Sequence, residues 1–237
     1  MPERTPPRQT RLRSAPLQSK LKGTPHMKRV FEDNGSLKLI FIRHAKPNYN
    51  DCGDRDCTDG DLDETGIAQC VALGERFRDI PVDAYFSSSL LRAFRTMAAI
   101  CDKKPDQPLI EVCPEIMECG TTAGYYGCSA EYLQQYYKNA KLCDTKMFGT
   151  AEYAFGCATD AENQLRAEKF VSYLKDRFTY GQCVAVTAHY AICEHLVAAA
   201  LGIKERNFHF AFTYTSATMV EIFPEGYSLL RCLNAMD

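Results

Sequence analysis

Two arginines and two histidines of this sequence lie at the ends of expected buried strands, or at the start of the helix that follows such a strand. These positions share one edge of the expected sheet. Arg43 and His44 directly follow one apolar run, and His189 directly follows another. Arg92 lies in the first turn of an expected helix. A neutral imidazole is a good nucleophile at neutral pH and can accept a phosphoryl group covalently. Arginine forks and a second, protonated histidine can hold the phosphoryl oxygens without a metal, so these residue types predict an anion site suited to phosphoryl transfer.

Alternating apolar strands and helices would have to position these side chains. Such alternation predicts an α/β fold, a three-layer sandwich with a mainly parallel sheet and helices on both faces. Ligands bind beyond the carboxyl ends of the strands in such sheets, so the arginines and histidines should converge there. The expected strands cover residues 37–42, 84–86, 110–112 and 183–188, with a C-terminal hairpin of 215–223 and 228–233.

The expected helices lie between these strands. The first begins at Asp63 or Thr65 and ends before Pro81, and the second follows Ser88 and Ser89, which are candidate N-caps. The buried face of the first helix should comprise Ile67, Cys70, Val71, Leu73 and Phe77. The remaining helices are expected over 129–141, over 161–178 and between His189 and Gly202.

The composition fits one globular domain of ordinary balance. The chain has 237 residues, of which 46% are apolar and 24% are charged, and its formal net charge is −2. The chain has no overall positive charge that would attract nucleic acid or an acidic membrane, and it has no apolar run long enough to span a bilayer. We therefore expect no nucleic-acid or membrane partner and a cytoplasmic location.

Twelve cysteines leave a choice between disulfides, metal and free thiols. The N-terminus offers no apolar signal segment that would favour a secreted disulfide framework. No C-x-x-C spacing occurs, and Cys52 and Cys57 form the closest pair, which disfavours a zinc site. Others, such as Cys101 and Cys193, lie in apolar stretches where a free thiol behaves as a small hydrophobe. We expect reduced thiols, and neither a metal site nor a cofactor.

Residues 1–36 differ from the rest of the chain. They are rich in proline and arginine and short of aliphatic residues, so they cannot bury enough surface to offset their ordering entropy. We interpret them as a disordered basic tail before a catalytic domain of residues 37–237. A targeting leader, or a natural start at Met27, is the alternative interpretation of this segment.

Five segments carry a resemblance to a known family. Residues 41–50, with the sequence FIRHAKPNYN, resemble the opening motif of the histidine phosphatase superfamily, the phosphoglycerate-mutase-like enzymes. The other four segments follow in the family's order: LDETGIAQ at 62–69, SSLLRAFRT at 88–96, PEIME at 114–118 and VAVTAH at 184–189. An Arg-His pair alone would be weak support, but five ordered segments over residues 38–230 are specific.

The resemblance implies a phosphohistidine mechanism that needs no metal. His44 would attack phosphorus, while Arg43, Arg92 and His189 would hold the phosphoryl oxygens. Asn50 would add a polar contact to the phosphate. The expected substrate is a small-molecule phosphate ester.

The resemblance also implies a carboxyl group that protonates the leaving oxygen. Glu118 ends the hydrophobic-x-Glu pattern of the fourth segment and is our choice for this proton donor. Glu115 is the alternative, because short motifs align loosely.

Departures from the family pattern leave the substrate open. Ala45 replaces the usual glycine, Ser89 replaces a proline, and the stretch after the acid is unusual at residues 120–124. Residues 125–160 resemble nothing specific. The opening Arg43-His44-Ala45-Lys46-Pro47 departs from the family's mutases and favours hydrolysis. A phosphoglycerate-type phosphomutase and a non-catalytic phosphate-binding module of the same fold remain the alternatives.

Overall fold

The computed structural model describes residues 34–53, 55–56, 58–122, 124–143, 159–205, 207 and 209–236. A seven-stranded sheet in the order β6-β5-β4-β7-β1-β8-β9 runs through the molecule. Strands β1, β4, β5, β6 and β7 are mutually parallel, and β8 is antiparallel to both of its neighbours, β1 and β9. Their bounds are β1 Leu37–Arg43, β4 Ala84–Ser88, β5 Ile110–Cys113, β6 Ala140–Leu142, β7 Cys183–Ala188, β8 Ala217–Ile222 and β9 Ser228–Ala235. Two short strands, β2 Pro47–Asn48 and β3 Asp61–Leu62, pair separately.

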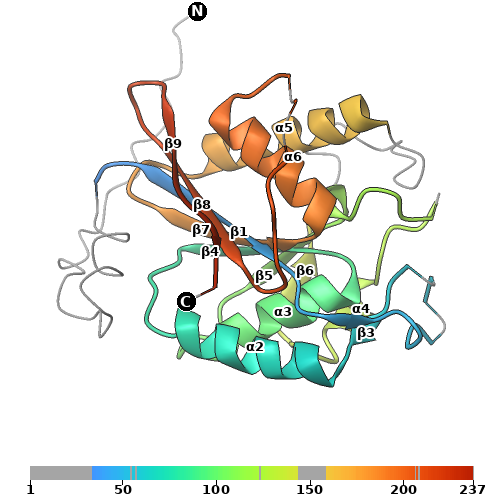
Figure 1. The fold of residues 1–237 in the computed structure, drawn as a ribbon. Helices are drawn as coiled ribbons and strands as arrows, with labels where there is room; N and C mark the ends of the chain where they lie inside the picture. The colour runs from blue at the N-terminus through green and yellow to red at the C-terminus, as the bar shows by residue number, and fades with distance from the viewer. Residues whose placement is uncertain are drawn as a thin grey trace, which may run out of the picture.

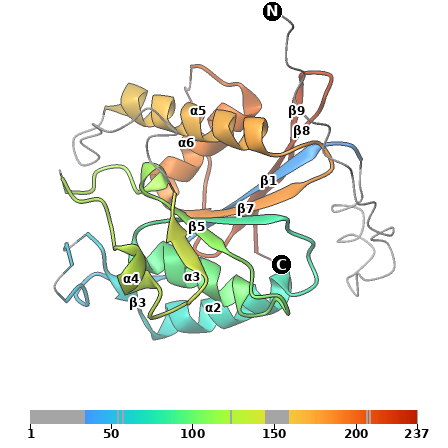
Figure 2. The same cartoon turned by 180° about the vertical axis from the view of Figure 1, so that it is seen from behind.

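Helices cover both faces of this sheet (Figures 1 and 2). Helices α2 and α3 lie on one face and α5 and α6 on the other, which confirms the predicted three-layer α/β fold with a mainly parallel sheet. The helical segments are α2 Glu64–Phe77, α3 Leu91–Cys101, α4 Ala130–Leu133, α5 Asp160–Arg177, α6 Tyr190–Leu201 and a 3₁₀ turn at Pro114–Ile116. No helix of the described ranges combines the length and the apolarity that crossing a membrane requires.

Strand β1 separates two hydrophobic cores. Successive side chains of a strand point to opposite faces of the sheet. Leu39 and Phe41 therefore pack into the core under α5 and α6, whereas Ile40 and Ile42 pack into the core under α2 and α3. All four are at most 1% exposed, and this burial on both faces fixes the strand that ends at the predicted nucleophile.

Most of the predicted elements are confirmed. The four expected parallel strands correspond to β1, β4, β5 and β7, and the C-terminal hairpin corresponds to β8 and β9. Asp63 is the N-cap of α2, and its side chain accepts a hydrogen bond from the Gly66 backbone. Helix α6 ends as expected at Gly202, whose φ of 74° is the left-handed conformation that favours glycine.

The helix predicted over 129–141 is wrong. Helix α4 covers only Ala130–Leu133, and the chain then turns into β6. Strand β6 pairs in parallel with β5, and the Ile110 amide donates to the Asn139 carbonyl at 2.9 Å. Pairing with the open edge of β5 outweighs the helix propensity of this segment.

The predicted buried face of α2 is partly wrong. Ile67 and Val71 are 44% and 57% exposed. The helix buries Cys70, Leu73 and Phe77 together with Gly66 and Gly74, because the two glycines let the helix approach neighbouring backbone. The true buried stripe is therefore rotated toward the glycines.

The folded part reaches further toward the N-terminus than the predicted domain boundary. Ser36 is buried, and the Asn34 side chain donates to Glu221 Oε1 at 2.9 Å. Residues 1–33 of the predicted tail lie outside the described residues.

Gly66 brings the start of α2 against the segment that follows the predicted nucleophile. A Cβ at this position would lie 2.1 Å from the Lys46 carbonyl oxygen, which is a backbone atom and cannot simply rotate away. We expect Gly66→Ala to lower the free energy of unfolding by about 1–3 kcal/mol, although alanine is the better helix former. Urea denaturation would measure this, with the exposed neighbour substitution Thr65→Ala as the control. An unchanged or higher stability of Gly66→Ala would contradict the close approach.

Candidate active site

Strand β1 delivers Arg43 and His44 to the carboxyl end of the sheet. His44 is 2% exposed, and its backbone amide donates to the Ala188 carbonyl at the end of β7. Its ring atom Nδ1 lies 2.7 Å from the carbonyl oxygen of Ala45. A carbonyl can only accept, so Nδ1 carries the proton and Nε2 keeps its lone pair. The backbone therefore fixes the tautomer in which Nε2 is available as a nucleophile.

Arg92 contacts the nitrogen that carries this lone pair. Its Nε–H donates to His44 Nε2 at 3.3 Å, and its Nη1 donates to the Thr58 carbonyl at 2.7 Å. The side chain comes from the first turn of α3 and is 2% exposed. A buried guanidinium at a helix N-terminus, beside a nucleophilic nitrogen, is a strong site for a phosphoryl dianion.

His189 follows β7 and lies beside His44. The two ring centroids are 5.0 Å apart, and His189 is fully buried. Its Nε2 lies 2.8 Å from the Ser88 hydroxyl. That hydroxyl accepts from the Leu90 amide, so its proton is available to donate to His189. His189 would then carry its own proton on Nδ1, a buried atom without a hydrogen-bond partner among the described residues.

Both histidines are held neutral. Burial is the main cause that lowers the pKa of His44 well below its ordinary value, and the charge of Arg92 lowers it further. Burial likewise lowers the pKa of His189, with Arg92 and His44 adding to the effect, so the expectation of a protonated second histidine is wrong for the free site. A neutral ring suits the nucleophile, because protonation would remove the attacking lone pair.

We expect nitrogen NMR of the histidine rings to detect both properties. Because the pKa of each ring is lowered, His44 and His189 should remain neutral at pH 6, where a histidine with the ordinary pKa of about 6.5 is mostly protonated. The His44 signals should be those of the Nδ1–H tautomer, since Ala45 accepts that proton. A His44 ring that takes up a proton near pH 6.5, or that carries its proton on Nε2, would contradict this assignment.

Arg43 is held between two tyrosines. Its guanidinium carbon lies 4.0 Å from the ring centroid of Tyr214 and 5.1 Å from that of Tyr190. Nη1 donates to the Phe212 carbonyl at 2.7 Å, whereas Nε is buried without a hydrogen-bond partner among the described residues. Buried polar groups are normally paired, so this Nε and Nδ1 of His189 are candidate donors to a bound anion.

The two candidate acids lie in different surroundings. Glu118 reaches the N-terminus of α6, where its carboxylate accepts hydrogen bonds from the amides of Ala191 and Ile192 at 3.4 and 3.2 Å. That helix begins directly after His189, so the carboxylate lies beside the chain segment that carries the second histidine. Glu115 is buried in the 3₁₀ turn at Pro114–Ile116. The role of proton donor stays a prediction for Glu118, whose hydrogen bonds also give it a structural role as a helix cap.

The turn that presents Glu118 is fixed from α5. Arg166, which is 1% exposed, donates through Nη1 to the carbonyl oxygens of Glu115 and Met117 at 2.8 and 2.7 Å. These contacts tie both candidate acids to one buried guanidinium.

Asn50 is not brought into the cluster. It is exposed, and its backbone amide donates to the Asn48 side chain at 3.1 Å. No hydrogen bond joins the Asn50 side chain to the histidines or arginines within the part of the chain that the structure describes. Its predicted phosphate contact stays a prediction.

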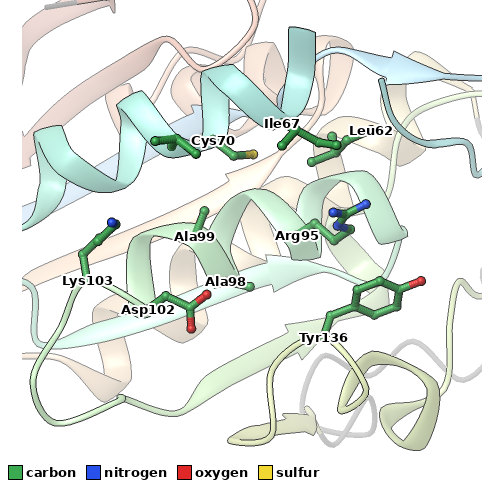
Figure 3. Close-up of a pocket in the computed structure, with 10 residues that line it drawn as sticks. Leu62, Ile67, Cys70, Arg95, Ala98, Ala99, Asp102, Lys103 and Tyr136 are labelled. Atoms are coloured by element: carbon green, nitrogen blue, oxygen red, sulfur yellow. The ribbon is translucent and has the colours of Figure 1, made fainter. Parts of the chain in front are cut away.

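A groove between α2 and α3 contains none of the residues of this cluster (Figure 3). It has a volume of about 400 Å³, and its wall includes the exposed side chains of Ile67 and Val71. Arg95 lines it and forms an ion pair with Asp61 at 2.6 Å, which agrees with a structural role for this second arginine of α3. In the described ranges, no three His, Cys, Asp or Glu side chains gather as metal ligands would.

Comparison with known proteins identifies the family. The family model described as histidine phosphatase superfamily (branch 1) matches residues 39–235. The chain belongs to the histidine phosphatase superfamily. The matched range contains every predicted site residue, so the five motifs in the sequence indicated the correct family.

Two curated relatives match shorter stretches of this superfamily member. A 2,3-bisphosphoglycerate-dependent phosphoglycerate mutase of Arabidopsis thaliana is 37% identical over 90 residues, which cover 35% of this chain and 27% of the mutase. A probable phosphatase of Schizosaccharomyces pombe is 32% identical over 75 residues, which cover 31% of this chain and 36% of that protein. The chain thus spans about a quarter to a third of the length of the curated relatives it matches.

Two solved structures share the histidine phosphatase fold over most of the chain. A putative alpha-ribazole-5'-P phosphatase from Escherichia coli has a TM-score of 0.62 at 22% identity, over 84% of this chain and 98% of that one. A mycobacterial glucosyl-3-phosphoglycerate phosphatase has a TM-score of 0.60 at 20% identity, over 84% and 99%. At these identities the likeness shows the fold.

Sequence reasoning missed one buried residue near the site of this superfamily member. Asp59 is fully buried, accepts the Leu91 amide at the start of α3 at 2.8 Å, and lies 3.9 Å from Arg92 Nη1. Tyr125 and Cys128 also donate to its carboxylate, at 2.7 and 3.4 Å. Asp59 thus performs the capping that we assigned to Ser88 and Ser89. It lies in a polar loop about 30 residues before α3, and nothing in its local sequence signals this contact.

Proposed function

We propose that this protein is a phosphatase that hydrolyses small phosphate monoesters through a phosphohistidine on His44, without a metal ion. One observation carries the proposal: Nδ1 of the buried, neutral His44 is bound to the Ala45 carbonyl, which leaves the Nε2 lone pair beside Arg92. The relatives named as phosphatases support the same reaction class.

In the first step, His44 Nε2 attacks phosphorus while the bond to the leaving oxygen breaks. Arg92 Nε–H now points at Nε2, so a bound phosphoryl group must take over this donor before the lone pair can attack. We assign the other oxygens to Arg43 Nε and His189 Nδ1, which are buried without a hydrogen-bond partner among the described residues. Positioning and charge stabilisation of this kind account for most of the catalysis of phosphoryl transfer.

The leaving oxygen departs with a proton from a carboxyl group, which we assign to Glu118. Water then attacks the phosphohistidine, the Nε2–P bond breaks, and one proton of the water returns to the carboxylate. Inorganic phosphate leaves, and His44 is again neutral with its proton on Nδ1. The cycle is balanced without a metal, an oxidant or a second substrate.

The second candidate is a phosphomutase that returns the phosphoryl group to its product. The curated relatives of this name favour it. Against it, the opening motif has Lys46 and Pro47 at positions where the family's mutases have other residues. Lys46 also forms an ion pair with Asp63 at 2.9 Å. Hydrolysis remains the conclusion that the chain's own residues support better.

Phosphate release distinguishes the two reactions. Purified protein would be given phosphate monoesters in excess chelator, with and without 2,3-bisphosphoglycerate as a primer. We expect inorganic phosphate to be released at a rate independent of the primer and the chelator. Primer-dependent transfer between substrates would identify a mutase, and loss of turnover in chelator would overturn the metal-free mechanism.

A further inference from the structure

Aromatic side chains lie beside both arginines of the site. The Arg92 guanidinium carbon is 5.5 Å from the ring centroid of Tyr49, which comes from the loop after β2. Arg43 lies between the rings of Tyr190 and Tyr214. These three tyrosines come from segments far apart in the sequence, and each lies beside one of the two arginines of the site.

Two of these rings are on the solvent side of the site. Tyr49 and Tyr190 are 51% and 36% exposed, whereas His44 is only 2% exposed. Tyr214 lies deeper, with its ring centroid 5.6 Å from that of His44. Phosphoryl transfer is roughly in line, so the leaving group departs on the side of phosphorus opposite His44. Since His44 is buried, that side faces the solvent, where Tyr49 and Tyr190 form what we call the tyrosine rim.

The charges that act on the site match a single phosphoryl group. Arg43, Arg92 and Arg166 are the cations whose charges lower the pKa of His189. Arg166 is occupied by two backbone carbonyls of the acid-bearing turn. Lys46, which acts on Tyr214, is paired with Asp63 at 2.9 Å, so Arg43 and Arg92 remain for the phosphoryl oxygens. A second phosphate or a carboxylate on the substrate would need further cations, whereas an uncharged ring would need aromatic surface such as the tyrosine rim provides.

We propose that this protein prefers aryl phosphate monoesters, with the aromatic leaving group packed against Tyr49 and Tyr190. The inference rests on the proposed phosphatase function and names its substrate class. The phosphoryl group is anchored by the arginines, and the ring attached to it stacks on side chains that the arginines already orient through cation–π contacts.

A pair of inert analogues tests this preference independently of leaving-group reactivity. Phenylphosphonate and cyclohexylphosphonate carry the same anion and a six-carbon ring, and differ in aromaticity. Calorimetry should find phenylphosphonate about three- to tenfold tighter on the wild type, the range that aromatic pairing provides. Tyr49→Leu and Tyr190→Leu should each move this ratio toward one, and Tyr49→Phe and Tyr190→Phe should preserve it.

The control is Tyr227→Leu, which alters a 53% exposed tyrosine stacked on Phe223 near the β8–β9 turn and should leave the ratio unchanged. A purely structural role of the rim would change the affinity for both phosphonates equally. A wild-type ratio of about one, or a ratio that both leucine variants leave intact, would overturn the inference.

Ester hydrolysis is measured on the same preparations of wild type and His44→Ala. Turnover that depends on His44 but shows no phosphonate preference overturns the aryl preference alone, whereas no His44-dependent turnover of any ester overturns the proposed function as well.

Discussion

His44→Ala is expected to lower the rate of phosphate release on the order of 10⁴-fold or more, because the proposed covalent intermediate forms on the Nε2 that the substitution removes. The substitution removes Nε2, the atom to which Arg92 donates at 3.3 Å, and leaves Arg92 beside an empty volume. Binding of the substrate should suffer less than turnover, since Arg43, Arg92 and His189 are all retained. A steady-state assay that separates kcat from KM measures this, and wild-type protein quenched in alkali should contain acid-labile phosphate on His44.

His209→Ala is the matched control for this substitution. The His209 side chain is 84% exposed and pairs with Glu194 at 3.1 Å, outside the site. Its loss should change phosphate release by less than about twofold. Both variants should unfold at similar urea concentrations if folding is unaffected. Residual turnover of His44→Ala within about tenfold of wild type, in excess chelator, would refute the phosphohistidine mechanism.

The layers of the fold could be predicted because their signals are local. Strand β1 is a continuous apolar run with large residues on both faces, and only a strand covered on both sides buries all of them. The end of α6 at Gly202 could also be predicted, because glycine readily adopts the left-handed conformation of a C-terminal cap. Strand β6 could not be predicted, because Ala140–Leu142 becomes a strand by pairing with the edge of β5 and not through its own three residues.

The candidate residues at the strand ends could be located from the sequence, whereas the residues that contact them from distant segments could not. Arg43 ends β1, and His44 and His189 directly follow β1 and β7, so the position of the strands locates them. Asp59 holds the start of α3 and lies near Arg92, but it does so across 32 residues of chain. Tyr214 contacts Arg43 from a turn in which Thr215 has a φ of 58°. A β-branched residue rarely adopts this conformation, so the sequence does not predict the turn. Such contacts depend on tertiary packing, and no spacing in the sequence encodes them.

Glu118→Gln is expected to slow hydrolysis of alkyl phosphates by about 10²- to 10³-fold, the contribution of a positioned general acid. Glutamine keeps the shape, and its one oxygen can still accept from the Ile192 amide at the start of α6, whereas the longer contact to the Ala191 amide is lost. The helix cap should therefore be weakened but retained, while the transferable proton is lost. Glu115→Gln changes the rival carboxyl group three residues earlier, in the same turn held by Arg166, and is the matched control.

The leaving group makes this comparison decisive. A nitrophenolate leaves without needing a proton, so Glu118→Gln should change the rate of nitrophenolate release in the first turnover by less than about fivefold. Later turnovers also need the carboxylate to take a proton from water, so the two esters are compared in the first turnover. An alkoxide needs the proton, so the deficit should grow as the leaving group becomes more basic. A structural defect would slow both esters alike. If Glu115→Gln produces the leaving-group-dependent loss and Glu118→Gln does not, the acid is Glu115, and Glu118 serves only to cap the helix that follows His189.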